Sequence, residues 1–280
     1  MNVGCVLLAA GAGKRFGGDG EKLFYEVGGT PMIVTALSLF AKIQFSAKVC
    51  VVRAGEERIS ALAKTVGFMP VENPNADQGV GTSVSVGTMK LLERRPDLDG
   101  ILYAVSDQPF LTKASVKRLL EAFEENPNRI VSLSFRGTRG NPAIFPRELY
   151  AELLALDTDI GGGAVIKRHP ELLALVEADS ARELMDIDCV RTGGIKKKNW
   201  ETLETCARSN GRTESEIARL FCGANEGDPV VLEECLDILI DALTESGLDD
   251  NSEPTAWGLT IEDAVSLFSR LLQTANDNEK

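Results

Sequence analysis

Histidine is nearly absent from this chain of 280 residues, which contains a single one, His169. No Ser-His-Asp catalytic triad is therefore indicated. His169 follows Lys167 and Arg168, and no cysteine or second histidine lies near it. We expect it at the exposed end of a helix and not on a metal ion.

Long apolar runs are missing as well. No segment is long enough to cross a bilayer. The apolar residues 3–10 are preceded only by Met1 and Asn2, without the basic stretch of a secretory signal. We expect a cytoplasmic protein with no membrane partner.

The cysteines form no Cys-x-x-Cys pair, which argues against a zinc site. We expect reduced thiols, most of them small buried apolar groups. The six cysteines are Cys5, Cys50, Cys189, Cys206, Cys222 and Cys235.

An excess of positive charge is also lacking, because the net charge is −12. Residues 201–280 carry 18 acidic and 5 basic residues, whereas the first 200 carry 24 acidic and 25 basic ones. Nothing resembles a basic nucleic-acid footprint, so we expect no nucleic-acid partner. The change in charge suggests a neutral domain over residues 1–199 and an acidic extension over 200–280.

Strand-like and helix-like patterns alternate along the neutral part. Apolar runs bounded by loop residues predict buried strands at 3–9, 48–53, 100–105 and 130–135. Helical patterns predict helices at 32–42, 56–65, 82–93 and 113–125. This alternation predicts a Rossmann-like, three-layer α/β/α domain that binds ligands at the carboxyl ends of its strands.

The acidic extension is expected to be a small helical appendage. A capping box of Thr213 and Glu216 starts one helix, which we expect to end at Gly223. Asp228 before a proline starts a second helix, and Thr260 starts a third.

A basic, glycine-rich loop, GAGKRFGGDGEKL, follows the first predicted strand. It fits neither the Walker pattern nor the dinucleotide fingerprint Gly-x-Gly-x-x-Gly. Gly11 and Gly13 would let the backbone approach a polyphosphate, and consecutive N–H groups form an anion nest. Lys14, Arg15 and Lys22 add positive charge that suits a triphosphate. The alternative is a plain strand-to-helix turn with solvated basic residues.

Acidic residues follow in two places. Asp107 comes directly after the strand at 100–105, where its carboxylate could hold Mg²⁺ or merely cap the next turn. In ELMDIDCV, residues 183–190, Asp186 and Asp188 alternate with apolar residues and would share one face of an extended segment. Near Asp107 they would complete a metal site; the alternative is a solvated edge strand.

Two further stretches are ambiguous when taken singly. Residues 73–87 contain a glycine turn followed by Thr82 and Ser83, which would cap a helix or contact a sugar. Residues 137–149 place Asn141 before an apolar run.

In their order along the chain, these stretches resemble the nucleotidyltransferases of molybdenum cofactor maturation, especially the cytidylyltransferases. The resemblance covers about residues 1–190 and consists of LAAGAGKRFG, EKLF, GGTPMI, NPNADQGVGTSVSVG, SDQPFLT, GNPAIFPRELY, DIGGGAVIKRHPELL and MDID. It implies transfer of CMP from CTP to a molybdopterin-type cofactor with release of pyrophosphate. Relatives that transfer GMP usually carry Leu-Ala-Gly-Gly at the first motif, and the alanine at position 10 here favours CTP.

The resemblance also implies residue roles. Lys14, Arg15 and Lys22 would hold the triphosphate beside the catalytic Asp107. Asp107 and Asp188 would hold Mg²⁺. No general base is required, because a phosphate nucleophile is already ionised. The implied nucleotide-binding residues are Leu8, Ala9, Ala10, Gly11, Gly13, Gly81, Thr82, Ser83 and Asn141.

Two other functions fit the same residues. One is a guanylyl or sugar-phosphate nucleotidyltransferase, with GTP or another acceptor. The other is a non-catalytic accessory protein that delivers cofactor to a molybdenum hydroxylase apoenzyme, with the helical appendage as its docking surface. The combination of paired acids with basic residues favours the enzyme.

Overall fold

The computed structural model describes residues 1–11, 21–27, 29–158, 160–186, 197–249 and 253–278. The chain divides into two compact units. The first comprises Met1–Glu26 and Thr30–Asp186, and the second comprises Val27–Gly29 and Ile187–Lys280. The domain boundary at residue 199 stays a prediction.

The N-terminal unit is built on a seven-stranded sheet with the strand order β5-β4-β1-β6-β8-β7-β9. All neighbouring strands pair in parallel except β8, which is antiparallel to both β6 and β7. The strands are β1 (Val3–Ala9), β4 (Ala47–Arg53), β5 (Met69–Asn73), β6 (Gly100–Val105), β7 (Ile130–Phe135), β8 (Thr138–Pro146) and β9 (Leu173–Glu177). A separate two-stranded ribbon joins β2 (Glu26–Val27) and β3 (Thr30–Pro31).

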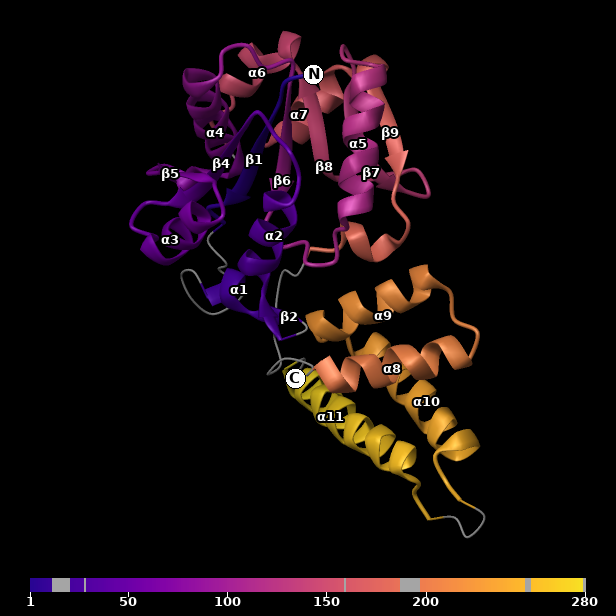
Figure 1. Cartoon of the computed structure of the whole chain (residues 1–280). Helices are drawn as coiled ribbons and strands as arrows, with labels where there is room; N and C mark the ends of the chain where they lie inside the picture. Colours follow the sequence, from indigo (N-terminus) through magenta and orange to yellow (C-terminus); the bar gives the residue numbers. More distant parts are fainter. Residues whose placement is uncertain (12–20, 28, 159, 187–196, 250–252, 279–280) are drawn as a thin grey trace. The chain divides into compact units, whose positions relative to one another are not determined.

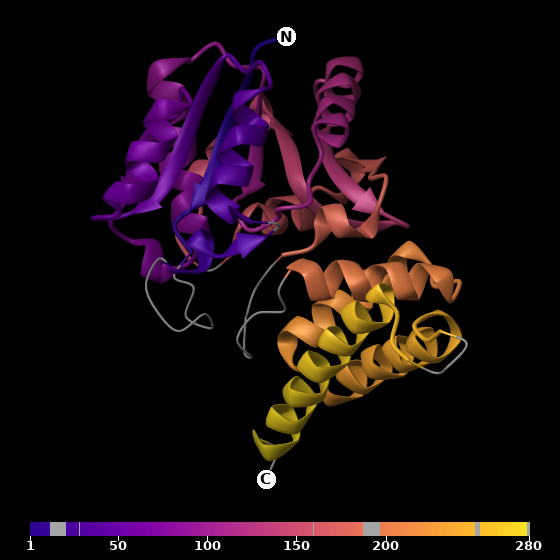
Figure 2. The same cartoon turned by 60° about the horizontal axis from the view of Figure 1, so that its bottom comes forward.

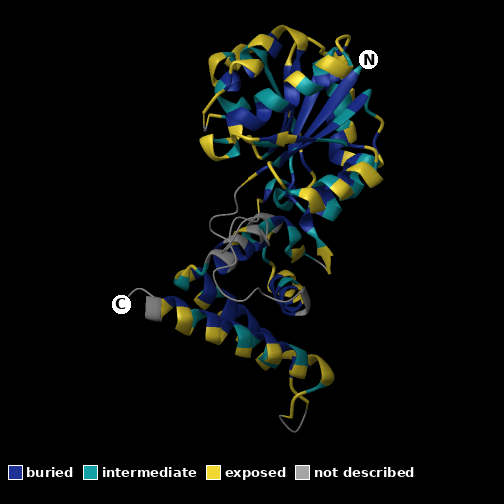
Figure 3. Cartoon of the chain, turned by 90° about the vertical axis from the view of Figure 1, so that its left-hand side faces the viewer, coloured by how far each residue is buried: buried dark blue, intermediate teal, exposed yellow. Residues whose placement is uncertain are grey.

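Helices cover both faces of this sheet (Figures 1 and 2). One apolar cluster joins the sheet to α2 (Met32–Ala41), α3 (Glu57–Thr65) and α5 (Lys113–Glu125). The other joins it to α4 (Val80–Arg94), α6 (Tyr150–Leu154) and α7 (Gly162–Arg168). Successive residues of β1 alternate between the two clusters, and the buried strands lie between exposed helix faces (Figure 3). The predicted three-layer α/β/α fold is confirmed.

Strand β8 is the main feature of the sheet that the sequence patterns did not predict. It contains Pro142, and proline normally argues against a central strand because it has no N–H to donate. The pairing of β8 with β6 runs from Pro146 back to Ala143, so Pro142 lies immediately outside it. On its other side, Pro142 faces the part of β7 between Ser132 and Ser134 where the register shifts. The proline is tolerated because the ladder is already interrupted there.

The described part of the C-terminal unit forms α8 (Lys197–Ser209), α9 (Glu214–Glu226), α10 (Pro229–Ser246) and α11 (Ala256–Asn278). Thr213 and Glu216 form the predicted capping box, and Asp228 caps α10 as predicted. No helix in the described residues is long and apolar enough to cross a membrane.

Two helix boundaries in this unit differ from the sequence prediction. Helix α9 continues past Gly223, which is buried against Val231, and ends at Gly227 in a left-handed conformation. Helix α11 begins about one turn before Thr260, because the side chain of Thr255 accepts a hydrogen bond from the N–H of Gly258 (3.0 Å).

Four of the cysteines, Cys5, Cys50, Cys206 and Cys235, are buried free thiols, as expected. Cys189 lies outside the described residues, and so does the side chain of Cys222. His169 is the C-terminal cap of α7, and its Nε2 lies 2.6 Å from Oε1 of Glu152. This is the predicted helix terminus, and the hydrogen bond from His169 lowers the pKa of Glu152.

Candidate active site

The candidate site lies where the strand order of the sheet reverses. Strand β1 is central, with β4 on one side and β6 on the other, and ligands of such sheets bind at this point. The N–H and the hydroxyl of Ser106 both donate to the carbonyl oxygen of Leu8, at 3.2 Å and 2.8 Å. These bonds fix the loop after β6 to the end of β1. They place Gly11 and Asp107 at neighbouring strand ends.

Lys22 and Asp107, two of the predicted catalytic residues, form an ion pair. Lys22 belongs to the short helix α1 (Glu21–Phe24), and its Nζ lies 2.6 Å from Oδ2 of Asp107. The side chains are 12% and 21% exposed, so the pair is held close to the sheet yet remains open to solvent on one side. The predicted site residues Gly13, Lys14, Arg15 and Asp188 lie outside the described residues.

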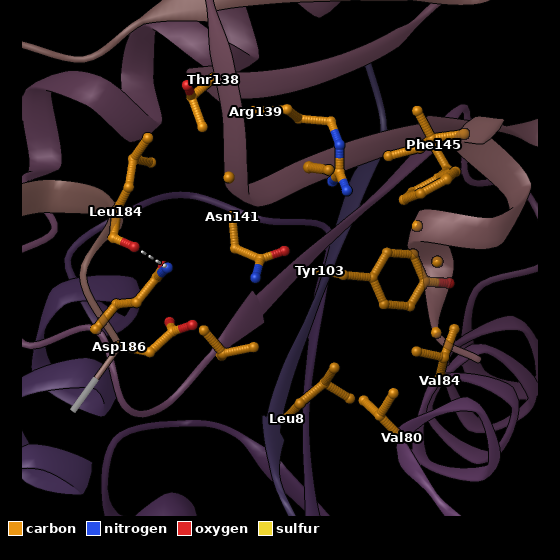
Figure 4. Close-up of a pocket in the computed structure, with 18 residues that line it drawn as sticks. Leu8, Val80, Val84, Tyr103, Thr138, Arg139, Asn141, Phe145, Leu184 and Asp186 are labelled. Atoms are coloured by element: carbon orange, nitrogen blue, oxygen red, sulfur yellow. Dashed lines mark hydrogen bonds between the residues drawn. The ribbon is translucent and has the colours of Figure 1, made fainter. Parts of the chain in front are cut away.

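A cavity of about 420 Å³ adjoins the Asp107 loop, and Gln108 and Asp186 line it. Figure 4 shows Asn141 and Asp186 on one side of the cavity, and Tyr103 and Phe145 on the other. Strand β8 adds the polar side chains of Thr138 and Arg139 to the lining. The glycines at 161–163 line the cavity at the start of α7. A cavity with one apolar and one polar wall suits a ligand that combines a ring with polar groups.

Of the predicted nucleotide-binding residues at the end of β1, only Leu8 places its side chain in the wall of the cavity. Ala9 and Ala10 are buried on opposite faces of the sheet, whereas Leu8 lines the cavity. The carbonyl of Ala10 accepts from Arg53 Nη1 (3.4 Å), and Arg53 Nη2 lies 2.7 Å from Oδ1 of Asp77. Arg53 and Asp77 were not among the site residues predicted from the sequence. The available signal was the position of Arg53 at the carboxyl end of a predicted strand.

Gly81, Thr82 and Ser83 lie in the first turn of α4 and are buried. The hydroxyls of Thr82 and Ser83 accept hydrogen bonds from Asn73 Nδ2, at 2.8 Å and 2.9 Å. Gly81 lies against the backbone of Thr158 and Ile160, and a Cβ at Gly81 would lie 2.5 Å from the Thr158 carbonyl oxygen. Their placement gives all three a structural role, and direct contact with a nucleotide stays a prediction.

The residues just before Met185 and Asp186 form a turn and not the extended segment expected over 183–190. Residues Ala181–Leu184 form a 3₁₀ turn, η5, because the Ser180 side chain accepts from the N–H of Arg182 (3.2 Å). Glu183 is turned into the protein and is 2% exposed, while Asp186 is exposed and lines the cavity. Met185 is extended and buried and Asp186 is exposed, as the alternation predicts for these two residues; Asp188 lies outside the described residues, so its place on the same face stays a prediction.

The donor set near Asp107 fits Mg²⁺ with help from a substrate. Among the described residues, no three His, Cys, Asp or Glu side chains are grouped as a metal site. Mg²⁺ usually needs only one or two carboxylates together with substrate phosphate oxygens. Asp107 is one such carboxylate, and Asp186 is a second on the wall of the adjoining cavity.

A family model described as MobA-like NTP transferase domain matches residues 5–172, more than half of the chain. The chain belongs to this family. It is thus a MobA-like nucleotidyltransferase, which confirms the resemblance drawn from the motifs. The match ends before α8–α11.

Curated relatives of this MobA-like chain carry different names. Nicotine blue oxidoreductase of Paenarthrobacter nicotinovorans is 28% identical over 193 residues, which are 66% of this chain and 91% of the relative. Bifunctional protein GlmU of Cupriavidus pinatubonensis is 34% identical over 122 residues, 44% of this chain and 25% of the relative. The 2-C-methyl-D-erythritol 4-phosphate cytidylyltransferase of Symbiobacterium thermophilum is 27% identical over 49% of this chain and 56% of the relative. The chain thus spans most of the first relative but only parts of the other two.

Solved structures show the same fold. Rv0371c from Mycobacterium tuberculosis H37Rv aligns with a TM-score of 0.59 at 21% identity, over 68% of this MobA-like chain and 93% of that one. The nucleotidyl transferase Mth528 from Methanothermobacter thermautotroptrophicus aligns with a TM-score of 0.55 at 21% identity, over 67% and 90%.

Proposed function

We propose that this MobA-like protein transfers CMP from CTP to a molybdopterin-type cofactor and releases pyrophosphate. The observation that carries the proposal is the Lys22–Asp107 pair beside the cavity lined by Asn141 and Asp186. The alanine at position 10 and the cytidylyltransferase among the relatives support CTP over GTP.

The part of the site around the Lys22–Asp107 ion pair would hold the triphosphate. Lys22 supplies a cation at the mouth of β1, and Lys14 and Arg15 of the same loop would add two more. Gly11 and Gly13 would admit the phosphates close to the backbone. A cytidine triphosphate carries enough negative charge to need several cations.

The cavity side would hold the acceptor. Its terminal phosphate oxygen would attack the α-phosphorus of CTP in line with the leaving group, forming one P–O bond. The bond from the α-phosphorus to the bridging oxygen breaks, and the pyrophosphate leaves with its electron pair. No proton has to be removed, so the work of the protein is to position and neutralise two anions.

Mg²⁺, held by Asp107 together with Asp188 or Asp186, would supply neutralisation of the pyrophosphate as it leaves. The chain's own part is to keep the Asp107 carboxylate at the end of β6, next to the Lys22 ammonium. A molybdenum hydroxylase apoenzyme would then receive the product.

Pyrophosphate release from CTP, GTP and ATP tests the reaction, with purified molybdopterin-type cofactor, a sugar 1-phosphate or 2-C-methyl-D-erythritol 4-phosphate as acceptor. We expect release only with CTP and the molybdopterin-type cofactor, loss of release in EDTA and recovery with Mg²⁺. Release with another acceptor or with GTP would assign the alternative transferase. No release with any pair would count against catalysis, and turnover of nicotine blue instead would favour the activity named for the oxidoreductase relative.

A further inference from the structure

Glu183 is a buried carboxylate whose two oxygens are both engaged. Its Oε2 accepts from the backbone N–H (3.0 Å) and the hydroxyl (2.8 Å) of Thr112, and its Oε1 accepts from the N–H of Asp179 (3.0 Å). The residue is 2% exposed. A carboxylate is this well buried only when hydrogen bonds replace its hydration.

Thr112 links this carboxylate to the catalytic loop. It closes the loop 106–112 that carries Asp107, and it is also the N-cap of the 13-residue helix α5, accepting from the N–H of Ser115 (3.2 Å). Glu183 therefore lies at a helix N-terminus, where negative charge is favourable.

The residues on either side of Glu183 also contact the loop 106–112. Gln108 Nε2 donates to the carbonyl of Leu184 at 3.2 Å, a bond drawn in Figure 4. The guanidinium of Arg182 lies 4.5 Å from the ring centre of Phe110. Three consecutive residues of η5 thus hold the loop 106–112, whose first residue is already fixed to β1.

We propose that Glu183 is a positioning residue that fixes the carboxylate of Asp107 relative to Asp186. The proposal rests on the proposed function, in which Asp107 is a metal ligand. Glu183 ties the loop that carries Asp107 to the turn that leads into Asp186, and it does so from a buried, fully bonded position. Mg²⁺ demands near-ideal octahedral geometry, so its ligands tolerate little displacement.

A carboxylate suits this position better than the amide of the same shape. Both of its oxygens face donors, so in Glu183→Gln one –NH₂ group would face an N–H or hydroxyl donor. Glu183→Gln therefore keeps the volume of the side chain and removes one of its two hydrogen-bond acceptors.

Mn²⁺ binding to the full chain with a non-hydrolysable CTP analogue, followed by electron paramagnetic resonance, tests the proposal. Glu183→Gln should weaken Mn²⁺ by about 10-fold, as loss of an outer hydrogen bond to a metal site does. The affinity for the analogue in EDTA should stay within about 2-fold, because that complex has no metal to misplace. Unchanged Mn²⁺ affinity in a folded Glu183→Gln protein would overturn the proposal.

Two reference variants separate the possible causes. Thr88→Val removes a buried hydroxyl that bonds to the Val84 carbonyl and the Tyr103 hydroxyl, so it should lower stability and leave Mn²⁺ affinity unchanged. Asp107→Asn should abolish Mn²⁺ binding. If it does not, the metal assignment of the proposed function fails, whatever Glu183 does.

Thr112→Ala serves if Glu183→Gln does not fold. It removes the hydroxyl donor and keeps the backbone N–H, so a smaller weakening of Mn²⁺ is expected. Wild-type Mn²⁺ affinity in this variant would then overturn the proposal.

Discussion

The ammonium nitrogen of Lys22 lies 2.6 Å from Oδ2 of Asp107, although 85 positions separate the two residues in the sequence. The pair joins the first helix after β1 to the loop after β6. The ion pair holds the two side chains in place while neither has a substrate. A triphosphate with its metal would offer both of them new partners, since Lys22 prefers phosphate oxygens and Asp107 prefers the cation.

Asp107→Asn should leave the fold intact and lower kcat by about 1,000-fold or more, since a catalytic metal contributes several kcal/mol to the transition state. Steady-state pyrophosphate release measures this, with circular dichroism to confirm folding. Turnover near the wild-type value would remove Asp107 from the metal site.

Lys22→Met should raise the KM for CTP by about 10-fold or more, because it deletes a charge-assisted contact of about 1.5–3 kcal/mol to the phosphates. Lys22→Arg keeps the charge and serves as the matched variant, with a smaller rise. Equal KM values for Lys22→Met and the wild type would show that Lys22 only neutralises Asp107.

Gly81→Ala should lower the free energy of unfolding by about 1–3 kcal/mol, because the new methyl group meets backbone oxygens of Thr158 and Ile160 at 2.5 Å and 2.8 Å. Urea unfolding gives the value. Gly11→Ala is the control, since no atom of the described residues lies within 4 Å of a Cβ there, and its stability should be unchanged.

Burial raises the pKa of the Cys50 thiol and of the Cys235 thiol to about 12, from 9.0. Neither should react with iodoacetamide in the native protein at neutral pH, whereas both should react after unfolding in guanidinium. Above the unfolded value the unfolded chain releases protons that the folded chain retains. The contribution of each buried thiol to the free energy of unfolding is therefore fully present below about pH 9. It is lost as the pH rises toward about 12, by up to about 1.4 kcal/mol per pH unit for each thiol. Urea titrations across that range measure the slope, and a flat profile would contradict the burial of these thiols.

Gly258→Ala should destabilise the C-terminal unit by about 2 kcal/mol or more, because a Cβ at Gly258 would lie 1.9 Å from the carbonyl oxygen of Gly247. Leu259→Ala is the matched control, since Leu259 is 56% exposed. Thermal unfolding followed by circular dichroism compares them, and equal midpoints would show that α10 and α11 do not approach this closely.

Much of the sheet was predictable from local pattern. The strands at 3–9, 100–105 and 130–135 have the predicted bounds, because runs that are apolar on both faces are typical of strands covered by two helical layers. Helix α5 also has the predicted bounds, residues 113–125, and the structure adds Thr112 as its N-cap. Strand β8 was not, because its proline is acceptable only where the neighbouring strands already break register.

The position of Glu183 shows where local pattern fails. The alternation of Asp186 and Asp188 with apolar residues predicted an extended segment over 183–190. Its first residues instead belong to the 3₁₀ turn that the Ser180 cap starts, and the Glu183 carboxylate accepts a hydrogen bond from Thr112 at the N-terminus of α5. That donor lies 71 positions away in the sequence. The residue spacing within the segment therefore cannot predict the contact between Glu183 and Thr112.

The sequence by itself determined the strands at 3–9, 100–105 and 130–135, the helices that cover both faces of the sheet, and the two places where a basic loop and an acid follow a strand. Each of these depends on neighbours within a few residues, so hydrophobic period and turn chemistry are sufficient to specify them. Only the tertiary structure decided that Lys22 meets Asp107 and that Glu183 fastens the Asp107 loop. Those contacts depend on which strands pair, and strand pairing is set by the packing of the whole core.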